Sequence, residues 1–527
     1  MKRNTLLAAL LLAGSASIYA QGEADAIRMS QRDITGTARS MSMADAFGAL
    51  GGDLSALWNN PAGIGVYRSS EFAGTLNLSM TSTNTKWGGS SINNDKTNFI
   101  FDNFGYVASF RGAGEFGFNV GVAYNRKASF NRVYTAENPS FGSSLTDFIA
   151  DQAYGIDPSW LDDLRGADKP YDPYLENLPW LSVLGWNAAL ITPNGQDAQG
   201  QQLYRSNFPG NMRPAARLNV RESGRVDEYN FTFGGNYDDL IYFGATLSVT
   251  DFAYRLTTGY DEDFHTDGGY YMENSLNTRG TGVNFKVGMI VRPVDFFRFG
   301  VAVHTPTYYS MTDKFGALVD SRNIYDGEDK DGKPIYINGR TSTPMGSVGY
   351  DMNTPFRFQT SAAFVIGKKG LLSFEYELQD YSSLKLKDDG GNESGENFYI
   401  KQNTRSINTF KVGGEYRVTP QFSLRAGYAY QSSPVKAEVY DGKVTVGTVG
   451  TMPNYVLPGK NQYFTAGLGY RFGSLYTDLA YVHKTEDANG FAFAPLYAND
   501  GSTVVASEPF SLKTKRSNIL LTVGLKF

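Results

Sequence analysis

Cysteine is absent from this chain of 527 residues, and histidine occurs only three times, as His265, His304 and His483. Without cysteine there are no disulfide bonds, thiol nucleophiles, iron–sulfur clusters or zinc–thiolate sites. So few histidines argue against a multi-histidine metal centre, and no nucleophile, base and acid stand in an arrangement typical of an active site. We therefore expect no enzyme activity, no catalytic residues, no metal and no cofactor.

Positive charge is not in excess either, because 48 Lys and Arg stand against 53 Asp and Glu, a formal net charge of −5. This balance argues against a broad basic surface and hence against a nucleic-acid partner. After residue 20, no apolar run approaches the roughly 18 residues that a membrane helix needs. Glycine, by contrast, is abundant with 58 residues, and so are Tyr with 34 and Phe with 35. This composition predicts an all-β chain.

Residues 1–20 have the pattern of a signal peptide. Lys2 and Arg3 give a basic start, an apolar stretch follows from Leu6 to Ala13, and small residues lead to Ala20 as the expected cleavage point. The alternative is a membrane anchor, but the apolar stretch is too short for one. We therefore expect the mature chain to leave the cytoplasm.

Alternation of apolar with small or polar residues recurs along the rest of the chain. In 115–125, for example, Phe116 and Val120 alternate with Gly117 and Asn119. Such a strand faces an apolar medium on one side and a polar interior on the other. The pattern predicts fourteen strands, at 71–82, 98–111, 115–128, 226–237, 240–253, 279–292, 296–305, 356–366, 370–381, 406–418, 421–431, 461–472, 475–484 and 515–527.

The connections between these strands are alternately short and long. The short ones are tight turns, such as Gly112–Gly114 and Asp238–Asp239, and the longest of the others covers 129–225. This layout is typical of a bacterial outer-membrane barrel with short periplasmic turns and long extracellular loops. We therefore predict a 14-stranded antiparallel transmembrane β-barrel over 71–527, in the outer membrane of a Gram-negative bacterium. A secreted β-sandwich is the alternative, but it does not explain the alternation.

The last strand places Phe527 on the same face as the preceding apolar residues. A terminal aromatic residue on the lipid face resembles the C-terminal assembly signal of outer-membrane proteins. The expected partners are therefore the barrel assembly machinery, outer-membrane lipid and lipopolysaccharide, and we expect the barrel to be a monomer.

Residues 21–70 do not alternate. Helical spacing predicts one short helix over 41–50 and a second over 54–58 that Asp53 caps. A fourteen-stranded barrel is too wide for its own side chains to fill, and it would leak without a plug. We therefore predict that 21–70 forms a small N-terminal hatch inside the barrel or at its periplasmic side.

The stretch GTARSMSMADAFGALGGDLSALWNNPAGIGVYR (36–68) resembles the hatch of the FadL-type transporters, which carry long-chain fatty acids and other hydrophobic compounds. The expected hatch motif is Asn60, Pro61, Ala62 and Gly63. A second stretch, 282–313, resembles the paired sixth and seventh strands of that family. The strand number of fourteen agrees with this resemblance.

The resemblance implies passive transport without energy input or covalent chemistry. A hydrophobic ligand, fatty acid in the first place, would be captured by extracellular loops and bound above the hatch. It would then leave sideways through the wall at a kink in the third strand. Gly117 and Gly121 are the candidate lateral gate, because glycine permits a bend; the alternative is that they make room for the hatch.

The connection 129–225 is unusually apolar and contains three of the five Trp residues of the chain. One interpretation is a groove that captures hydrophobic ligands, and the other is a loop domain packed on itself. The candidate capture residues are Phe148, Trp160, Leu164, Trp180, Leu184 and Trp186.

Cations on the inward face of the barrel could hold the head group of a fatty acid. The candidates are Lys286, Arg357, Lys411 and Arg425. The alternative is a network of ion pairs between the wall and the hatch. The alternative function of the whole chain is a FadL-like partner or shuttle in protein secretion, or a structural outer-membrane protein, which a polar lumen without a pocket would favour.

Overall fold

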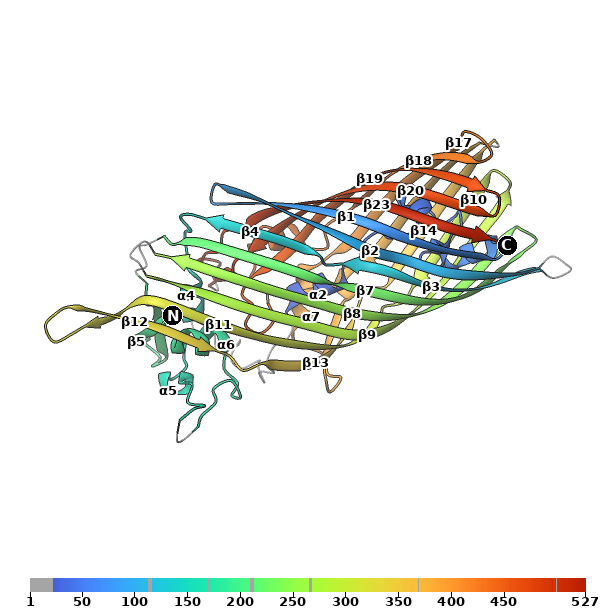
Figure 1. Ribbon diagram of the computed structural model, residues 1–527. Helices are drawn as coiled ribbons and strands as arrows, with labels where there is room; N and C mark the ends of the chain where they lie inside the picture. The colour runs from blue at the N-terminus through green and yellow to red at the C-terminus, as the bar shows by residue number, and fades with distance from the viewer. Residues whose placement is uncertain are drawn as a thin grey trace.

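The structure, a computed structural model, describes all residues except 1–21, 112–115, 168–169, 209–212, 265–267, 368 and 499. The expected signal peptide and the turn at 112–114 therefore lie outside the described residues. None of the described helices is long and apolar enough to cross a bilayer. The chain forms one long barrel with helices inside it and at one end (Figure 1).

Fourteen antiparallel strands close the barrel, as the sequence predicts. Each strand pairs with the next along the wall, and the last pairs with the first. In order they are β1 (Glu71–Trp87), β2 (Ser90–Arg111), β3 (Phe116–Ser129), β7 (Ala215–Tyr237), β8 (Ile241–Asp263), β9 (Gly269–Val294), β10 (Phe297–His304), β14 (Arg357–Ile366), β15 (Gly370–Asp380), β17 (Ser406–Arg417), β18 (Phe422–Gln431), β19 (Tyr455–Phe472), β20 (Leu475–Phe491) and β23 (Phe510–Lys526).

The other elements lie in the N-terminal segment and in the long connections. The N-terminal segment holds α2 (Glu23–Ser30), α3 (Ala38–Met41), η1 (Leu54–Leu57) and η2 (Pro61–Val66). The connections hold β4 (Arg132–Asn138), α4 (Leu145–Gln152), α5 (Pro158–Leu161), α6 (Trp180–Asn187), β5 (Ile191–Gln196), β6 (Gln202–Ser206), β11 (Tyr308–Glu328), β12 (Pro334–Ser342), β13 (Gly346–Asn353), η3 (Tyr381–Ser383), β16 (Lys385–Asp388), α7 (Glu396–Asn403), α8 (Ala437–Tyr440), β21 (Leu496–Tyr497) and β22 (Thr503–Val505).

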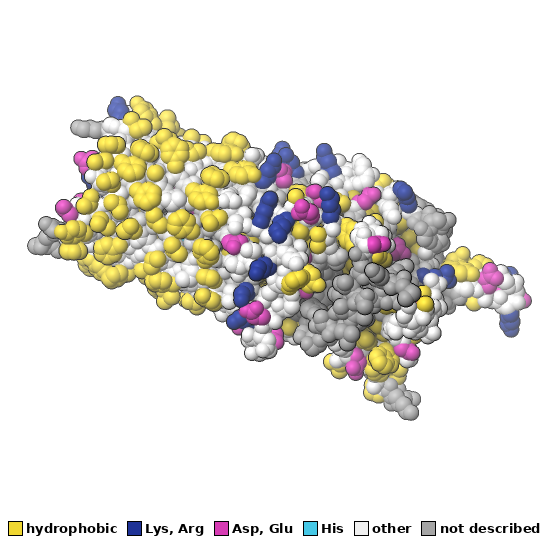
Figure 2. All heavy atoms as spheres, turned by 180° about the vertical axis from the view of Figure 1, so that it is seen from behind, with side chains coloured by type: hydrophobic (Ala, Val, Ile, Leu, Met, Phe, Trp, Pro, Cys, Tyr) yellow, Lys and Arg dark blue, Asp and Glu magenta, His cyan; other side chains and the backbone are white. Residues whose placement is uncertain are grey.

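The alternation of apolar residues changes face along a single strand. In β8, the apolar residues near the short-turn end point outward, so that Phe243 and Leu247 are 42% and 49% exposed. Further along the same strand they point inward, so that Tyr254 and Leu256 are only 2% and 1% exposed, while Arg255 faces outward. Figure 2 shows the result on one face of the molecule, a broad apolar band over one end of the barrel with charged side chains beyond its edge.

This change of face explains why two segments that the sequence pattern predicts to be loops are strands in the structure. The stretch 83–97 is a hairpin, in which β1 and β2 continue to a two-residue turn with positive φ at Gly88 and Gly89. Most of 254–278 likewise continues β8 and β9. The prediction expected apolar residues on the outer face, whereas in these extensions they lie on the inner face. The extensions carry the barrel wall well beyond the apolar band.

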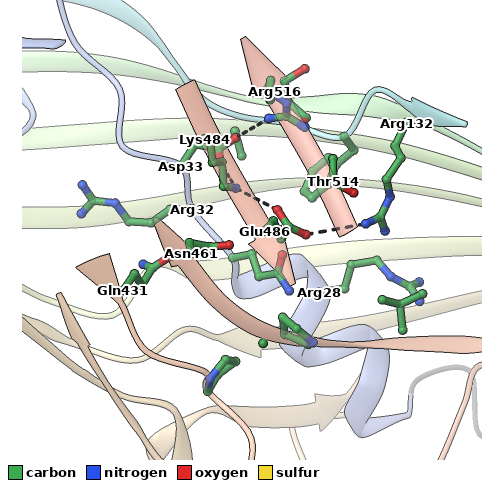
Figure 3. Close-up of a pocket in the computed structure, with 18 of the residues that line it drawn as sticks. Arg28, Arg32, Asp33, Arg132, Gln431, Asn461, Lys484, Glu486, Thr514 and Arg516 are labelled. Carbon is green, nitrogen blue, oxygen red and sulfur yellow. Dashed lines mark hydrogen bonds and ion pairs between the residues drawn. The ribbon is translucent and has the colours of Figure 1, made fainter. Parts of the chain in front are cut away.

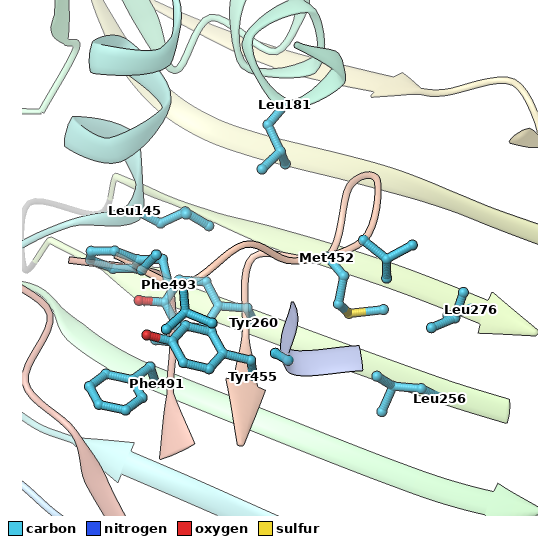
Figure 4. Close-up of a cluster of buried hydrophobic side chains, with 14 of the residues drawn as sticks. Leu145, Leu181, Leu256, Tyr260, Leu276, Met452, Tyr455, Phe491 and Phe493 are labelled. Atoms are coloured by element: carbon cyan, nitrogen blue, oxygen red, sulfur yellow. The ribbon is translucent and has the colours of Figure 1, made fainter. Parts of the chain in front are cut away.

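An apolar core fills the barrel between these extensions (Figure 4). Leu256 and Tyr260 come from the wall, Leu145 and Leu181 come from α4 and α6, and Met452 comes from the connection before β19. Helix α2 lies within the same cluster and contributes four buried residues, Ala24, Ala26, Ile27 and Met29. We call the part of the barrel beyond the apolar band the upper barrel. It is stabilised like the interior of a soluble protein, by burial of apolar surface.

Short helices and turns of the N-terminal segment lie against the inner wall nearer the short-turn end. The predicted helix over 41–50 is wrong: α3 covers only Ala38–Met41, and the residues that follow form turns. Ala44 and Asp45 break the helix with φ of 53° and 55°. In this turn the Ala44 N–H donates to Thr465 Oγ1 of the wall at 3.1 Å. The predicted Asp53 cap is confirmed, since its carboxylate accepts the Ser55 N–H at 3.0 Å.

Candidate ligand path

A cavity lies beneath the apolar core, where the chain passes from α2 toward α3 (Figure 3). Its lining joins this N-terminal stretch to wall strands β3, β7, β17, β18, β19, β20 and β23, together with the start of β4. Basic side chains outnumber acidic ones, with Arg28, Arg32, Arg132, Lys484 and Arg516 against Asp33, Glu222 and Glu486. Apolar groups such as Phe130, Ile407 and Val456 complete the wall. The cavity therefore offers both apolar surface and positive charge.

A chain of ion pairs crosses this cavity, as the dashed lines of Figure 3 show. Asp33 accepts from Arg516 at 3.1 Å and from Lys484 at 2.8 Å. Lys484 also pairs with Glu486 at 2.9 Å, and Glu486 lies 3.6 Å from Arg132. Burial alone would raise the pKa of Asp33, but the two neighbouring cations outweigh burial and lower its pKa to about 2. Asp33 is thus a carboxylate at neutral pH.

The ladder of hydrogen bonds between β2 and β3 stops partway along the two strands. Its last pair is Asn103 with Asn125. Beyond this pair β2 continues only against β1, and β3 continues only against β7, with a bulge between Arg126 and Ala128. No backbone ladder therefore joins the two strands above Asn103.

A second cavity reaches the wall at this interruption. It is lined by Ile100 and Asp102 of β2 and by Arg126 of β3. It shares five lining residues with the first cavity, namely Asp33, Ala128, Ser129, Lys484 and Arg516. The two cavities therefore adjoin, and together they lead from beneath the apolar core to the gap between β2 and β3.

Polar side chains gather on β3 and β7 at the edge of this gap. The Arg126 Nε and the Tyr124 hydroxyl donate to the Asp227 carboxylate at 2.7 and 2.9 Å. Arg225 donates to the same carboxylate at 2.7 Å. These contacts join β3 to β7, while β2 at this height pairs with β1 and has no backbone ladder to β3.

A second break in the wall is sealed. The ladder between β10 and β14 stops at His304 and Arg357, and it resumes between β11 and β13 after Pro306 and Pro355. Thr307 and Thr354 bridge this break, since the Thr307 N–H donates to Thr354 Oγ1 at 2.9 Å and the Thr354 N–H donates to the Thr307 carbonyl at 3.1 Å. The cavity behind it shares only Arg32 with the first cavity.

The two glycines predicted as a lateral gate lie in an unbroken part of β3. Gly117 pairs with Arg111 and Asn236, and Gly121 pairs with Val107 and Thr232. The interruption of β3 lies further along the chain, after Asn125. A Cβ atom on Gly121 would stand 2.8 Å from Leu57 Cδ2 and 3.0 Å from Ile64 Cδ1. This geometry agrees with the alternative that Gly121 makes room for the N-terminal segment.

The four predicted head-group partners are all engaged by carboxylates. Lys286 lies 2.7 Å from Glu228, and Arg357 lies 3.3 Å from Glu377. Lys411 contacts Asp45, Glu375 and Glu377 at 3.3, 2.8 and 2.5 Å, and Arg425 contacts Glu415 and Asp478 at 2.6 Å each. The contacts of Lys411 join the wall to Asp45 of the N-terminal segment. The geometry therefore favours a structural ion-pair network, and a role in ligand binding stays a prediction.

The six predicted capture residues divide between the core and the surface. Phe148, Trp180 and Leu184 are buried in the apolar core, where the Trp180 ring lies 5.2 Å from that of Phe315. Trp186 is half-buried, and its indole N–H donates to Asp162 at 2.7 Å. Trp160 and Leu164 are exposed, at 60% and 43%. Most of this connection is thus a packed domain, and only its outer edge offers apolar surface to water.

The Asn60–Gly63 motif fixes the N-terminal segment against β8 and β9. Asn60 Oδ1 accepts the Ala62 N–H at 3.1 Å, and its Nδ2 donates to the Gly48 carbonyl at 2.5 Å. The motif lies so close to the wall that a Cβ atom on Gly288 of β9 would overlap Asn60 Oδ1. Ala62 packs with Tyr242 and Ile290. The motif thus seats the segment on the wall, and none of its four residues lines either of the two cavities that contain Asp33.

The residues of the cavity were missed by the sequence-based reasoning, although the sequence contains a signal for them. Lys484 and Glu486 interrupt the inward apolar series at the upper end of β20, and Arg28, Arg32 and Asp33 form a charged cluster before the motif. Within the described ranges, no three His, Asp or Glu side chains converge as a possible metal site.

Comparisons with known proteins agree with this architecture. Residues 271–526 match the family model described as outer membrane protein transport protein (OMPP1/FadL/TodX). The fold is similar to the crystal structure of a Pseudomonas aeruginosa FadL homologue, with a TM-score of 0.52 and 14% identity over 94% of this chain and 99% of that one. The Ralstonia pickettii toluene transporter TbuX gives a TM-score of 0.47 and 14% identity over the same shares. No curated protein matches the chain.

The barrel, the N-terminal segment and the sequence match define the class. Residues 271–526, just under half of the chain, match the OMPP1/FadL/TodX family of outer-membrane transport proteins, and the barrel has the fold of a FadL homologue. The chain is therefore an outer-membrane β-barrel similar to the transport proteins of that family.

Proposed function

We propose that the protein transports amphipathic molecules with an acidic head group, in the first place long-chain fatty acids, by passive diffusion. The long connections face the outside, and the ligand leaves sideways between β2 and β3 into the outer membrane. The observation that carries this proposal is the pair of adjoining cavities, which lead from beneath the apolar core to the interrupted ladder after Asn103 and Asn125.

The charge of the path favours an acid over a neutral hydrocarbon. The cations around Asp33 already have carboxylate partners, as the four predicted head-group partners do, but in this lining five cations stand against three acids. A carboxylate head group can therefore share their charge-assisted hydrogen bonds, which are the strong ones. Toluene cannot form such bonds and gains only the weaker cation–π attraction of its ring for these groups. An acyl chain gains about 0.8 kcal/mol for each CH₂ that leaves water for an apolar site, so its uptake needs no energy source.

The N-terminal segment has two roles in this proposal. Residues 31–70 act as the hatch that keeps the lumen closed toward the periplasm, after removal of the signal peptide 1–20. Helix α2 occupies the apolar core in which an acyl chain would be bound, and it yields that space when a ligand arrives. Trp160 and Leu164, exposed at the outer edge of the loop domain, provide the first apolar contact.

Two cysteines placed on either side of the gap test the lateral exit. Ile100→Cys on β2 and Ala128→Cys on β3 face the same cavity, and the chain has no other cysteine. Joining them with a bifunctional thiol reagent in intact cells should stop uptake of labelled oleate, because the strands can no longer separate. Cleavage of a reducible linker should restore uptake.

The control joins the same two strands where their ladder is regular. Tyr106 and Val122 lie directly opposite each other and face outward. The pair Tyr106→Cys and Val122→Cys should cross-link without loss of uptake. Equal uptake in both cross-linked proteins would contradict an exit between β2 and β3, and equal loss would point to a general effect of cross-linking.

Matched ligands test the acidic head group. Oleate and oleyl alcohol share one chain and differ in the carboxylate, and toluene represents the aromatic hydrocarbons. Purified protein should bind oleate more tightly than oleyl alcohol, and toluene least. Equal affinity for the acid and the alcohol would remove the argument from charge and leave aromatic hydrocarbons as an equal candidate.

The role as a partner in protein secretion or as a structural barrel predicts a lumen without a pocket. The cavities beside Asp33 argue against that alternative. If neither oleate, oleyl alcohol nor toluene binds the purified protein, the alternative becomes the better account.

A further inference from the structure

A large cavity opens at the short-turn end of the barrel, below the N-terminal segment. It encloses about 1210 Å³ of space, part of it open to solvent, and its ceiling includes Leu50, Gly51 and Gly52. Seven of its lining residues are basic and one is acidic. The basic residues are Arg39, Arg68, Arg298, Lys369, Arg417, Arg471 and Lys526, and the acidic one is Glu415. In a chain with a formal net charge of −5, this is a strong local excess of positive charge.

Only some of these basic residues are paired with carboxylates. Lys526 pairs with Glu71 at 2.9 Å, and Arg68 pairs with Asp239. Glu415 is shared, because it accepts from Arg425 at 2.6 Å as well as from Arg39 at 3.4 Å. The single acid of the cavity is therefore already satisfied.

Four cations remain, and we call them the basic vestibule: Arg298, Lys369, Arg417 and Arg471. None of them has an ion pair among the residues that the structure describes. Arg298 donates one bond to the Leu50 carbonyl at 2.8 Å, and its Nε atom is buried without any partner. Cations gathered without counter-charge repel one another, so their arrangement is favourable only with an anion present.

The vestibule is too wide for one small anion. Arg298 lies on β10, Arg417 on β17 and Arg471 on β19, and Lys369 lies beside Arg417, whose N–H donates to the Lys369 carbonyl at 2.7 Å. From β10 to β19 there are five strand intervals, or about 24 Å of wall at roughly 4.8 Å per interval. An extended peptide covers about that distance with roughly seven residues at 3.3 Å each.

We infer that the basic vestibule docks an acidic segment of a periplasmic protein. The carboxylates of such a segment pair with Arg298, Arg417 and Arg471 in turn, directly beneath the floor of the N-terminal segment. The orientation of this mouth toward the periplasm rests on the proposed function. The charge complementarity does not, because it follows from the lining of the cavity alone.

Fluorescence anisotropy with the full-length protein in nanodiscs tests this inference. The probes are a labelled Glu-rich peptide and the same peptide with Gln in place of Glu. The Glu peptide should bind at least about tenfold more tightly, since its charge-assisted bonds are lost in the Gln peptide. Its affinity should also fall with rising salt, because the vestibule is open to solvent.

The variant Lys369→Gln, Arg417→Gln, Arg471→Gln should lower the affinity for the Glu peptide about tenfold or more. A matched control removes three exposed arginines that already have carboxylate partners, by Arg217→Gln, Arg322→Gln and Arg340→Gln. The control should bind the peptide as the wild type does. Equal loss in both variants, or no loss in either, would overturn the inference.

Two further measurements distinguish peptide docking from the binding of a small anion and from ligand transport. If orthophosphate displaces the peptide at concentrations near its own binding constant, the vestibule is a small-anion site, and docking of a protein segment is wrong. Oleate uptake should be unchanged in the vestibule variant, because its residues lie outside the proposed path. If uptake fails in the wild type while the peptide still binds, the transport proposal fails and the docking inference stands.

Discussion

Strands such as β8 run through both the lower and the upper half of the barrel, and the two halves have opposite chemistry. Near the short turns, Phe243 and Leu247 of β8 face outward, and the lumen holds buried ion pairs such as that of Lys411 with Glu375. Beyond the apolar band, Arg255 faces outward, and Leu256 is buried in the apolar core. Along β8 the surroundings of the wall thus change from those of a membrane protein to those of a soluble protein, while the pairing of β8 with β7 and β9 continues unchanged.

The difference teaches that environment, and not local strand geometry, decides which face is apolar. In lipid the outer face must be apolar, so the lumen is left to polar side chains and to the N-terminal segment. In water the outer face must be polar, so apolar residues turn inward and build a core. The proposed path begins where the two regions meet, at the polar cavity below this core.

The largest effect is expected from the ion pairs of the lower lumen. Lys411 has a fully buried side chain that contacts three carboxylates. Lys411→Met would leave these acids buried without their partner, and we expect a loss of about 3–5 kcal/mol in the free energy of unfolding. Urea unfolding of the protein in lipid vesicles measures this loss.

The control for this variant is Lys513→Met, which removes an exposed lysine of β23 that lies 3.9 Å from Asp487. Its effect should stay within about 0.5 kcal/mol. If Lys411→Met is as mild as the control, the ion pairs do not hold the lower lumen together.

A charge on the outer face distinguishes the two halves directly. Leu247→Arg places a cation in the apolar band, and we expect it to cost about 2–4 kcal/mol near the bilayer midplane. Thr257→Arg makes the same change on the same face of β8, beyond the band, and should be nearly neutral. Unfolding in vesicles measures both, and equal costs would contradict the boundary between the halves.

A bulky residue at the seat of the N-terminal segment should loosen the hatch. Gly121→Ile would clash with Leu57 and Ile64, and overpacking of this kind costs about 1–3 kcal/mol. We expect an assembled barrel with increased ion conductance in planar bilayers. Gly74→Ile, where the nearest atoms to a Cβ lie 3.7 Å away, is the control and should conduct like the wild type.

The smallest effect concerns the pH dependence of α2 docking. Burial raises the pKa of Glu23 and that of Glu396 to about 7. Asn403 donates to both Glu23 oxygens, at 2.9 and 3.0 Å. Between the ordinary pKa of 4.5 and about 7, Glu23 of α2 and Glu396 of α7 hold protons in the docked state that they have lost when α2 is free, so docking weakens as pH rises through this window.

Hydrogen exchange of the α2 amides, corrected for the intrinsic effect of pH, measures this dependence. Protection should decrease as pH rises toward about 7. Glu396→Gln should retain part of that protection at high pH, because the amide cannot ionise. Protection that is independent of pH in the wild type would show that these two acids do not control docking.

Much of the fold could be predicted from the sequence, because strands that face lipid have a strong pattern. All fourteen strands lie where the alternation places them, and Phe527 is exposed on the outer face as expected. The upper strands were mistaken for loops, since their apolar residues had the opposite phase. The helix over 41–50 was overestimated because tertiary contacts of Ala44 and Asp45 with the wall override local spacing.

The candidate site was harder to predict than the fold. The gap between β2 and β3 arises because β3 pairs only with β7 beyond Asn125. The sequence of a strand shows that it is a strand, but it does not show which strands it pairs with. The cavity brings Asp33 together with Lys484 and Arg516, which are separated by more than 400 positions in the sequence. Only the closed barrel makes these residues neighbours.

The most direct test of the central claim is an accessibility scan along β8. Because the chain has no cysteine, single cysteines carrying spin labels can be placed at each position from 242 to 261. The odd positions from 243 to 249 should be reached by oxygen dissolved in lipid, and the odd positions from 253 to 261, except the buried Gly259, by a water-soluble nickel reagent. The even positions should be protected from both. Odd positions that remain in lipid beyond 251, or even positions open to water there, would contradict a barrel whose upper half encloses an apolar core.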